Sequence, residues 1–263
     1  MDDIDALAQA NPAMGYGLLT ERALAANRET FPEAKFRSEC MCQQVETLLP
    51  QPFPDGAWNG GVDSSSFIIP ESDLYYGIDM STDRRWISIA VCGMRDDGNY
   101  HIEVAARVPD AEKAIDGFRV RVLRGPMKLA FQGRGAPVTG LAEQICTLKG
   151  IERCAVEGQE LSDGWGRFYD GIAASAPLLP GEAPKKGAKI YHLPQPVLDA
   201  PAKTMQMRNL GGGVELPDRV KSPDDIAPLF ACFVAMAAAS AIDKDKRKIY
   251  DSAYAAGSEL VFI

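Results

Sequence analysis

The sequence predicts an α/β fold in which helices flank a mixed central sheet. The first observation is a continuous apolar run at 74–80, as expected for a buried central strand. The second is that two further strand patterns follow directly, so the first three strands should be antiparallel neighbours. The third is that strands and helices alternate afterwards, which is typical of parallel α/β units.

An N-terminal arm is predicted before this fold. Residues 1–65 are interrupted by proline and glycine, with helical stretches at 18–27 and 36–49. The segment 50–61 is rich in proline and glycine and is expected to be a loop. We therefore divide the chain into an arm at 1–65 and a main domain at 66–263.

Within the main domain, strands at 86–94 and 100–108 flank the hairpin sequence R-D-D-G-N. Apolar and polar residues alternate along 100–108, which indicates a half-exposed strand nearer the edge. The remaining expected elements are a helix capped by Asp110, a strand at 127–131, a helix opening at Pro137, a strand at 154–157, a helix capped by Ser162, a strand at 189–193, a helix at 197–208, a basic loop or hairpin at 209–221, a buried helix at 225–241, a charged linker at 243–250 and a strand at 258–263. Three antiparallel strands followed by α/β units is the order of the ribonuclease H-like fold.

Composition limits the function. A net charge of −8 is unfavourable for nucleic-acid binding, because phosphate contacts need Lys and Arg, although a local basic rim can coexist with it. The six cysteines lack CxxC spacing, which favours reduced thiols in a cytosolic protein. The apolar run 226–242 contains a proline and fits a buried helix better than a membrane span. No G-x-x-x-x-G-K-[ST] motif occurs, so we expect no P-loop ATPase in this chain.

The first candidate site residue is Asp79, within the G-I-D-M-S stretch at 77–81. A carboxylate inside an apolar strand is costly to bury unless it is paired or metal-bound. One interpretation is that Asp79 ends the strand and caps the next turn. The other is that it bridges two divalent cations in a hydrolytic site.

The second acidic position is S-P-D-D-I at 222–226, where Asp224 and Asp225 precede the buried helix. Taken alone, an aspartate here is an ordinary helix cap. In the predicted order, however, the last helix packs beside the first strand, so its N-terminal acid should face Asp79. Two carboxylates meeting there suit Mg²⁺ or Mn²⁺, which prefer oxygen ligands.

Several motifs, taken in order, carry a family resemblance. They are N-P-A-M-G-Y-G at 11–17, F-R-S-E-C-M-C at 36–42, G-I-D-M-S-T-D-R-R-W-I-S-I-A at 77–90, H-L-P-Q-P-V-L-D-A-P at 192–201, D-R-V-K-S-P at 218–223 and D-I-A-P-L-F-A at 225–231. Over roughly residues 8–242 the chain resembles the nuclease domain of the large terminase subunit of tailed phages, with the segment that precedes it.

The resemblance implies a two-metal-ion DNA endonuclease that uses Mg²⁺ or Mn²⁺, with Asp79 and Asp225 as catalytic metal ligands. It would cut concatemeric viral DNA during genome packaging, without sequence specificity. The implied partners are double-stranded DNA, the ATPase half of the terminase that this chain lacks, the small terminase subunit and the portal. The implied location is the host cytoplasm, as part of the packaging motor and not of the virion.

One position departs from the family. Its fourth strand usually ends in a second metal-binding acid, but here that position is Gln132. Either another acid replaces it, or the domain binds metal weakly and cuts only when docked on its motor, or the residue was altered to suppress cutting. The candidate replacements are Glu157, Asp83 and Asp224, with Glu103 weaker.

Basic residues could line a DNA groove, although solvated surface charges are the simpler alternative. The expected DNA contacts are Arg84, Arg85, Gln132, Arg134, Arg208, Arg219 and Lys221. His192 is expected to satisfy a hydrogen bond in the core. Two other functions stay open: a non-catalytic DNA-binding or motor-docking module of the same fold, and a nuclease resembling junction resolvases.

Overall fold

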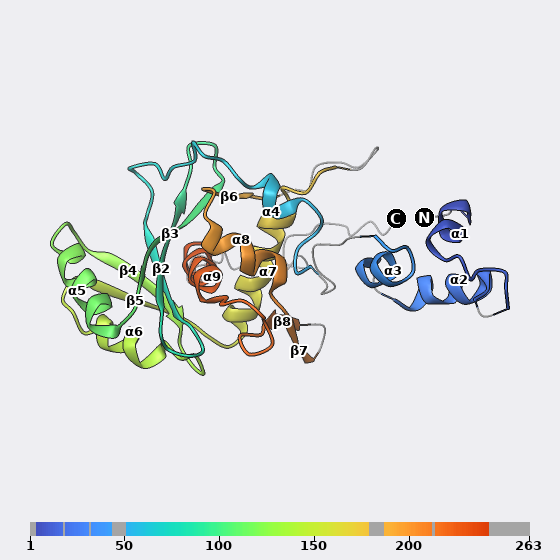
Figure 1. The fold of residues 1–263 in the computed structure, drawn as a ribbon. Coiled ribbons are helices and arrows are strands. Elements are labelled where there is room, and N and C mark those ends of the chain that lie inside the picture. Colours follow the sequence, from blue (N-terminus) through green and yellow to red (C-terminus); the bar gives the residue numbers. More distant parts are fainter. Residues whose placement is uncertain are drawn as a thin grey trace, which may run out of the picture.

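The computed structural model describes residues 4–17, 19–31, 33–43, 51–178, 187–211 and 214–241. Its centre is a six-stranded sheet with the order β5-β4-β1-β2-β3-β6 (Figure 1). The strands are β1 Tyr75–Met80, β2 Ile87–Met94, β3 Tyr100–Val108, β4 Met127–Gln132, β5 Ile151–Val156 and β6 Ile190–His192. β1, β2 and β3 are antiparallel, whereas β4 is parallel to β1, β5 to β4 and β6 to β3. The predicted mixed sheet is confirmed.

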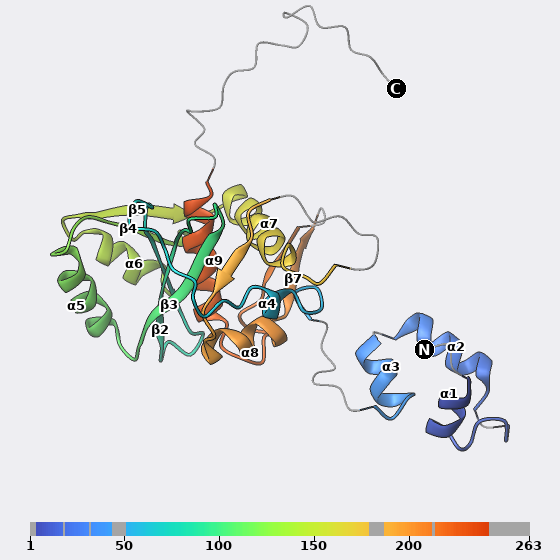
Figure 2. The same cartoon turned by 90° about the horizontal axis from the view of Figure 1, so that it is seen from above.

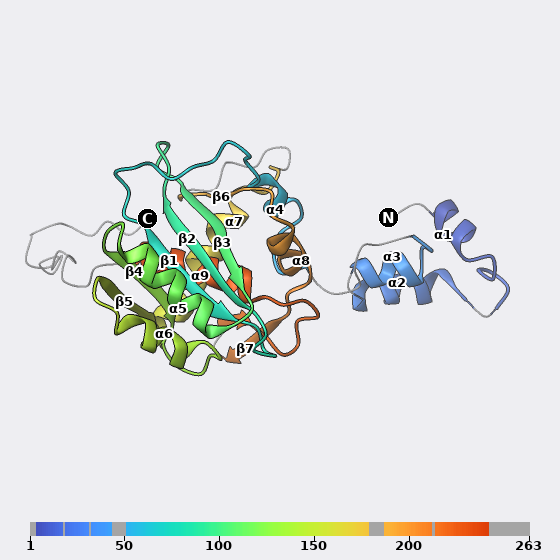
Figure 3. The same ribbon diagram turned by 60° about the vertical axis from the view of Figure 1, so that its left-hand side comes forward.

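Helices cover both faces of this sheet. Figure 3 shows α5 (Ala111–Val122) and α6 (Thr139–Cys146) on the near face and α9 (Ala227–Ala239) behind. Each face has its own apolar core, because alternate strand residues point to opposite sides. On the α9 side, α7 (Gln159–Ala173) and α8 (Pro196–Thr204) pack against α9 and form a further layer.

Gly77 allows α9 to lie directly on β1. A Cβ atom at this position would lie 1.9 Å from the carbonyl oxygen of Ala231. Only glycine permits such a close approach of two backbones. The predicted packing of the last helix on the first strand is thus present, two residues before Asp79.

The segment that starts at residue 51 packs into the α9-side core. Phe53 and Trp58 are buried, and Trp58 belongs to α4 (Ala57–Gly60). The Trp58 indole stacks on the His192 ring at 3.9 Å, and a 3.1 Å hydrogen bond joins His192 Nε2 to the Trp58 carbonyl. His192 is therefore a hydrogen-bonded core residue, as predicted. The division at residue 65 stays a proposal, and this packing favours starting the domain at residue 51.

The arm contains α1 (Ile4–Ala10), α2 (Glu21–Thr30) and α3 (Glu33–Glu39), which Figure 2 shows grouped together. Their buried residues Leu24, Phe36 and Cys40 form a third, small core. The helix predicted over 36–49 ends at Glu39, and its stretch 44–49 lies outside the described residues. All six cysteines are free thiols. None of the helices in the described part of the chain has the length and apolarity to span a bilayer.

Some predicted boundaries are wrong. α7 begins at Gln159 instead of after Ser162, because Gly158 adopts a φ of 60° and separates the helix from β5. The helix expected to reach residue 208 ends at Thr204, since residues from 207 onward pair in a hairpin instead. That hairpin comprises β7 (Met207–Gly211) and β8 (Val214–Pro217), one of the two predicted alternatives. The predicted linker 243–250 and strand 258–263 lie outside the described residues.

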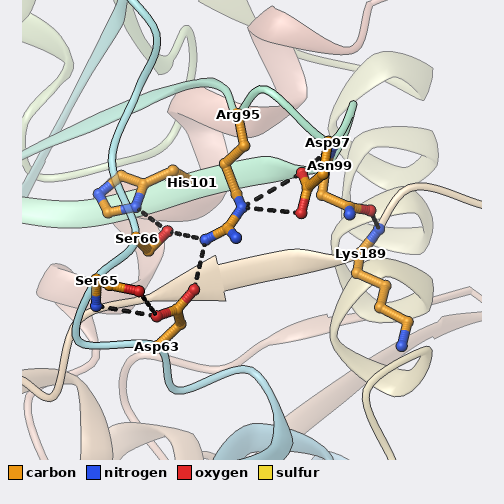
Figure 4. Close-up of polar contacts among 8 residues, drawn as sticks. All are labelled: Asp63, Ser65, Ser66, Arg95, Asp97, Asn99, His101 and Lys189. Atoms are coloured by element: carbon orange, nitrogen blue, oxygen red, sulfur yellow. Dashed lines mark hydrogen bonds and ion pairs between the residues drawn. The ribbon is translucent and has the colours of Figure 1, made fainter.

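A polar cluster joins the segment 63–66 to the β2–β3 hairpin (Figure 4). Arg95 Nη1 donates to Asp63 Oδ2 at 2.9 Å and to Ser66 Oγ at 2.5 Å, and Arg95 Nε lies 3.3 Å from Asp97. Ser66 Oγ is also 2.7 Å from Nδ1 of the buried His101. These contacts fasten the segment 63–66 to the hairpin end of the sheet.

Candidate active site

Asp79 lies in β1 with only 1% of its side chain exposed, and Arg219 neutralises it. Arg219 Nε donates to Asp79 Oδ2 and Nη2 donates to Oδ1, both at 3.1 Å. Its third nitrogen, Nη1, donates to Gln132 Oε1 at 3.0 Å. The guanidinium thus joins the residue at the end of β4 to the predicted metal ligand in β1.

A turn and an aromatic ring hold Arg219 in this position. Asp218 Oδ1 accepts hydrogen bonds from the backbone N–H groups of Val220, at 2.9 Å, and Lys221, at 3.1 Å. The Arg219 guanidinium carbon lies 3.7 Å from the centre of the Phe230 ring in α9. Only 14% of the Arg219 side chain is exposed. The guanidinium therefore lies between the strand ends and the last helix.

Asp225 precedes α9 and has two partners. Its Oδ1 accepts from the N–H of Ala227, the first residue of α9, at 3.0 Å, whereas the N-cap position belongs to Ile226 and has no side-chain cap bond. Its Oδ2 accepts from Arg107 Nη2 at 2.8 Å. The Arg107 guanidinium lies over the Trp86 ring, 4.9 Å from its centre. Asp225 is 28% exposed, unlike Asp79, so solvent and ions can reach it.

The electrostatics of Asp79 differ from those of an ordinary ion pair. Burial raises the pKa of its carboxyl to about 6, although the charge and hydrogen bonds of Arg219 act in the opposite direction. The nearby negative charge of Asp225 raises the pKa of Asp79 further. Arg219 thus offsets only part of the cost of burying this carboxylate. Such a centre favours the binding of additional positive charge.

A cavity of about 350 Å³ opens beside this centre. Three carboxylates and two guanidinium groups line it, among other residues: Asp83, Asp224, Asp225, Arg107 and Arg219. Asp83 accepts from Ser81 Oγ at 2.6 Å, and this bond lowers the pKa of its carboxyl. Asp224 accepts from Thr204 Oγ1 at 2.6 Å.

Glu157 lies in a neighbouring cavity of about 360 Å³ with Gln132 and Arg134. It forms an ion pair with Arg134 at 2.9 Å, in which the Arg134 side chain is 86% exposed. Glu103 instead approaches His101, at 3.8 Å on β3. Glu157 is therefore placed nearer to the Gln132 position than Glu103 is.

The other predicted DNA contacts are surface residues. Arg84 and Arg85 are exposed in the turn after β1, where Arg84 has a φ of 58°. Arg208 is exposed on β7, and Lys221 is exposed in the turn that presents Arg219. None of these four side chains lines the 350 Å³ cavity, although Arg84 and Arg85 follow Asp83 in the chain and Lys221 precedes Ser222, both of which do. Arg219 is instead turned inward onto Asp79.

Three site residues were missed from sequence: Arg107, Trp86 and Ser88. In the sheet register Asp79 pairs with Ser88, and Ser88 pairs with Arg107. Asp79, Ser88 and Arg107 therefore form one row on one face of the sheet. Ser88 Oγ is buried and has no hydrogen-bond partner in the described structure. Correct strand registration would have predicted this row, but a bulge between Ile89 and Ala90 shifts the pairing.

The donor atoms are of the kind that a divalent cation prefers, although in this structure they are not arranged to hold one. Asp79, Asp225 and the Gln132 amide offer oxygen atoms, which Mg²⁺ and Mn²⁺ prefer. The guanidinium of Arg219 already occupies this position as a cationic group. Among the described residues, no group of three His, Cys, Asp or Glu side chains is arranged to hold a metal. Binding of one ion would therefore need Arg219 to leave Asp79, and a second ion would need further ligands to move.

Comparison with known proteins gives similarity at the level of structure. No protein-family model matches the chain, and no curated protein sequence matches it. The large terminase of bacteriophage HK97 superposes with a TM-score of 0.55 at 14% identity, over 90% of this chain and 54% of that one. The nuclease domain of the large terminase subunit gp2 of bacterial virus Sf6 gives 0.47 at 9% identity, over 72% of this chain and 98% of that one. The magnesium-bound large terminase nuclease of thermophilic phage G20c gives 0.47 at 7% identity, over 68% and 95%.

The sheet order and the helix on β1 define a ribonuclease H-like domain, as predicted. The similarity to the HK97 protein is one of fold: this chain has the fold of part of that large terminase. It spans about half the length of the HK97 chain.

Proposed function

We propose that this chain is the nuclease part of a DNA-packaging terminase and hydrolyses phosphodiester bonds in duplex DNA. The observation that supports this proposal is the buried Asp79 beside Asp225, around a position that holds a cationic group. Concatemeric viral DNA, cut without sequence specificity in the host cytoplasm, is the substrate that the fold suggests. The ATPase half, the small terminase subunit and the portal are the corresponding partners.

The residues divide into those that hold a metal and those that hold DNA. Asp79 and Asp225 would bind Mg²⁺ or Mn²⁺, and Arg107 orients Asp225 through its 2.8 Å bond. When bound, the cation would supply positive charge to the scissile phosphate and acidify the attacking water. For the second ion of a two-ion site, Asp83 and Asp224 are the nearest candidates in the cavity, and Glu157 is the candidate beside Gln132.

The exposed basic side chains would bind the phosphate backbone of the DNA. Such contacts hold DNA without reading its sequence. We assign this role to Arg84, Arg85, Arg134, Arg208 and Lys221, with Gln132 and Arg219 closer to the reacting phosphate.

A second candidate function is a DNA-binding or motor-docking module that does not cut. Two observations favour it: Arg219 uses both oxygens of Asp79, and Gln132 provides no charge. A protein of this kind would retain DNA affinity without hydrolysis.

Cleavage of supercoiled plasmid in Mn²⁺ tests the proposal. The wild-type protein should nick and linearise the plasmid, and Asp79→Asn and Asp225→Asn should each reduce the rate by about 10²-fold or more. Asp116→Asn is the matched control, because this aspartate is 67% exposed in a surface pair on α5. DNA binding without cleavage by the wild-type protein would favour the non-cutting module. Preference for four-way junctions over linear duplex would favour a resolvase-like nuclease.

A further inference from the structure

Arg219 has a position that the proposed hydrolysis does not explain. It contacts the two residues, Asp79 and Gln132, that end or nearly end the central strands β1 and β4. A DNA-binding arginine would be expected to point into the cavity. Instead, its side chain is 14% exposed and lies against Phe230.

Arg219 seals Asp79 from a divalent cation in this arrangement, because it covers a carboxylate that is only 1% exposed. The guanidinium takes one hydrogen bond to each carboxylate oxygen, in the two-pronged geometry that gives strong ion pairs. A divalent cation needs direct contact with at least one of these oxygens. Metal binding must therefore break the contact between Asp79 and Arg219.

A phosphate group is the natural alternative partner for this guanidinium. The planar fork of arginine matches carboxylate and phosphate oxygens equally well. Arg219 also forms part of the wall of the 350 Å³ cavity, so its side chain can turn towards that space without displacing a strand. The next residue, Val220, is 86% exposed, so the turn that carries Arg219 is open to solvent.

The surroundings of the turn would bring phosphate to this position. Lys221 belongs to the turn itself, and its N–H donates to Asp218 Oδ1 at 3.1 Å. Arg208 lies on β7 opposite Leu216, two residues before Asp218. Both basic residues therefore lie near the base of the Arg219 turn. A DNA backbone attracted by them would pass close to Arg219.

We propose that Arg219 occupies the cation position until a DNA phosphate draws it away, so that DNA binding opens the metal site. This inference rests on the proposed function and adds a regulatory step to it. Without DNA, the guanidinium neutralises Asp79 and excludes the metal. With DNA, Arg219 binds a phosphodiester and leaves Asp79 free to hold the cation with Asp225.

Ser88 gives independent support that this centre is incompletely satisfied. Its hydroxyl is fully buried, has no partner in the described structure and shares a row with Asp79. Buried hydroxyl groups without partners are uncommon and usually indicate a missing water or ligand. The row that holds Asp79 thus contains an unpaired hydrogen-bonding group while Arg219 occupies the carboxylate.

The proposal has a thermodynamic consequence. If DNA strengthens metal binding, metal must strengthen DNA binding by the same factor. Removing Arg219 should abolish this coupling and leave the metal site permanently accessible.

Calorimetric titration of Mn²⁺ into the full chain tests the inference, with and without a short duplex, whose own Mn²⁺ binding is subtracted. Without DNA, Arg219→Gln should bind Mn²⁺ about tenfold or more tightly than the wild type, and the duplex should give the wild type a comparable gain. The matched control is Arg153→Gln, because Arg153 on β5 forms a similar two-pronged pair with Glu143 on α6. It should behave like the wild type. Equal Mn²⁺ affinities of the wild type and Arg219→Gln would overturn the inference.

A second variant guards against misfolding. Arg219→Lys keeps the charge but not the fork, so its Mn²⁺ affinity should lie between those of the wild type and Arg219→Gln. Addition of Mn²⁺ should raise the melting temperature of Arg219→Gln more than that of the wild type. An equal rise in both would contradict the inference. Tight Mn²⁺ binding by Arg219→Gln, together with no plasmid cleavage by the wild type, would overturn only the proposed hydrolysis, whereas cleavage by the wild type with equal Mn²⁺ affinities would overturn only the role of Arg219.

Discussion

Two shielded arginines, Arg95 and Arg219, serve the two ends of the same sheet in different ways. Each has a side chain that is 14% exposed. Arg95 lies at the hairpin between β2 and β3, whereas Arg219 contacts Asp79, whose row includes the start of β2 and the end of β3. Arg95 has two carboxylate partners, and Arg219 has one carboxylate and one amide.

The pKa values of the carboxyl groups of Asp63 and Asp79 are shifted in opposite directions. Asp63 is 26% exposed, and hydrogen bonds from Ser65 and Arg95 lower the pKa of its carboxyl to about 2. Asp79 is 1% exposed, and burial raises the pKa of its carboxyl to about 6. An ion pair close to water fastens a loop. A sealed pair in which the carboxylate is incompletely compensated is better suited to a binding site.

The largest expected difference is in stability. Arg219→Ala should lower the free energy of unfolding by about 3 to 5 kcal/mol, because it leaves a buried carboxylate without a counter-charge. Arg95→Ala should lower it by less than half as much, because Asp63 and Asp97 regain water. Urea denaturation in EDTA measures both values. Equal losses would show that the two pairs are equivalent.

The two pKa shifts should make the stability of the folded state depend on pH in opposite directions. Between pH 4 and 6 the folded state binds more protons at Asp79 than the unfolded state, so this residue makes stability fall as pH rises. At Asp63 the unfolded state binds more protons below about pH 4, so stability is lost as pH falls towards 2. Melting temperatures in EDTA should lose the first trend in Asp79→Asn and the second in Asp63→Asn. Unchanged profiles in the variants would refute the assignment.

A single substitution should make the surroundings of Arg219 resemble those of Arg95. Gln132→Glu gives Arg219 a second carboxylate partner, as Arg95 already has. At pH 7 it should raise the free energy of unfolding by about 1 kcal/mol, because a hydrogen bond to a charged group replaces one to an amide. Combined with Arg219→Gln, it should tighten Mn²⁺ binding about tenfold over Arg219→Gln alone. Weaker Mn²⁺ binding by the double variant would argue against position 132 as a ligand site.

The smallest stability effect is expected at an exposed pair. Arg134→Ala should change the free energy of unfolding by less than about 0.5 kcal/mol, because surface ion pairs contribute little. If Arg134 contacts phosphate, this variant should also reduce the salt dependence of DNA binding by about one unit in the log–log slope. An unchanged slope would leave Arg134 outside the DNA contact surface.

Local patterns were enough to predict much of the fold. The hairpin sequence after Met94 and the apolar run ending at Met80 fixed three antiparallel strands, and the same run drew attention to Asp79. The uniform apolarity of α9 predicted its burial, and its position after Asp225 brought the second acid into the site.

Long-range contacts were not predictable in the same way. The pairing of Arg219 with Asp79 joins residues 140 positions apart, and only the close packing at Gly77 and the turn at Asp218 bring them together. From composition alone, Arg219 resembles any other exposed basic residue near a DNA groove. The end of α8 was also missed, because pairing between β7 and β8 overrides the helical tendency of residues 207–208.

Anomalous scattering from crystals grown with Mn²⁺ and without DNA would locate the cation at Asp79. In Arg219→Gln we expect one Mn²⁺ within about 2.5 Å of oxygen atoms of Asp79 and Asp225, and in the wild type the guanidinium at that position. Mn²⁺ bound at Asp79 in the wild type with Arg219 still paired to it, or Mn²⁺ bound away from Asp79 in the variant, would contradict this expectation.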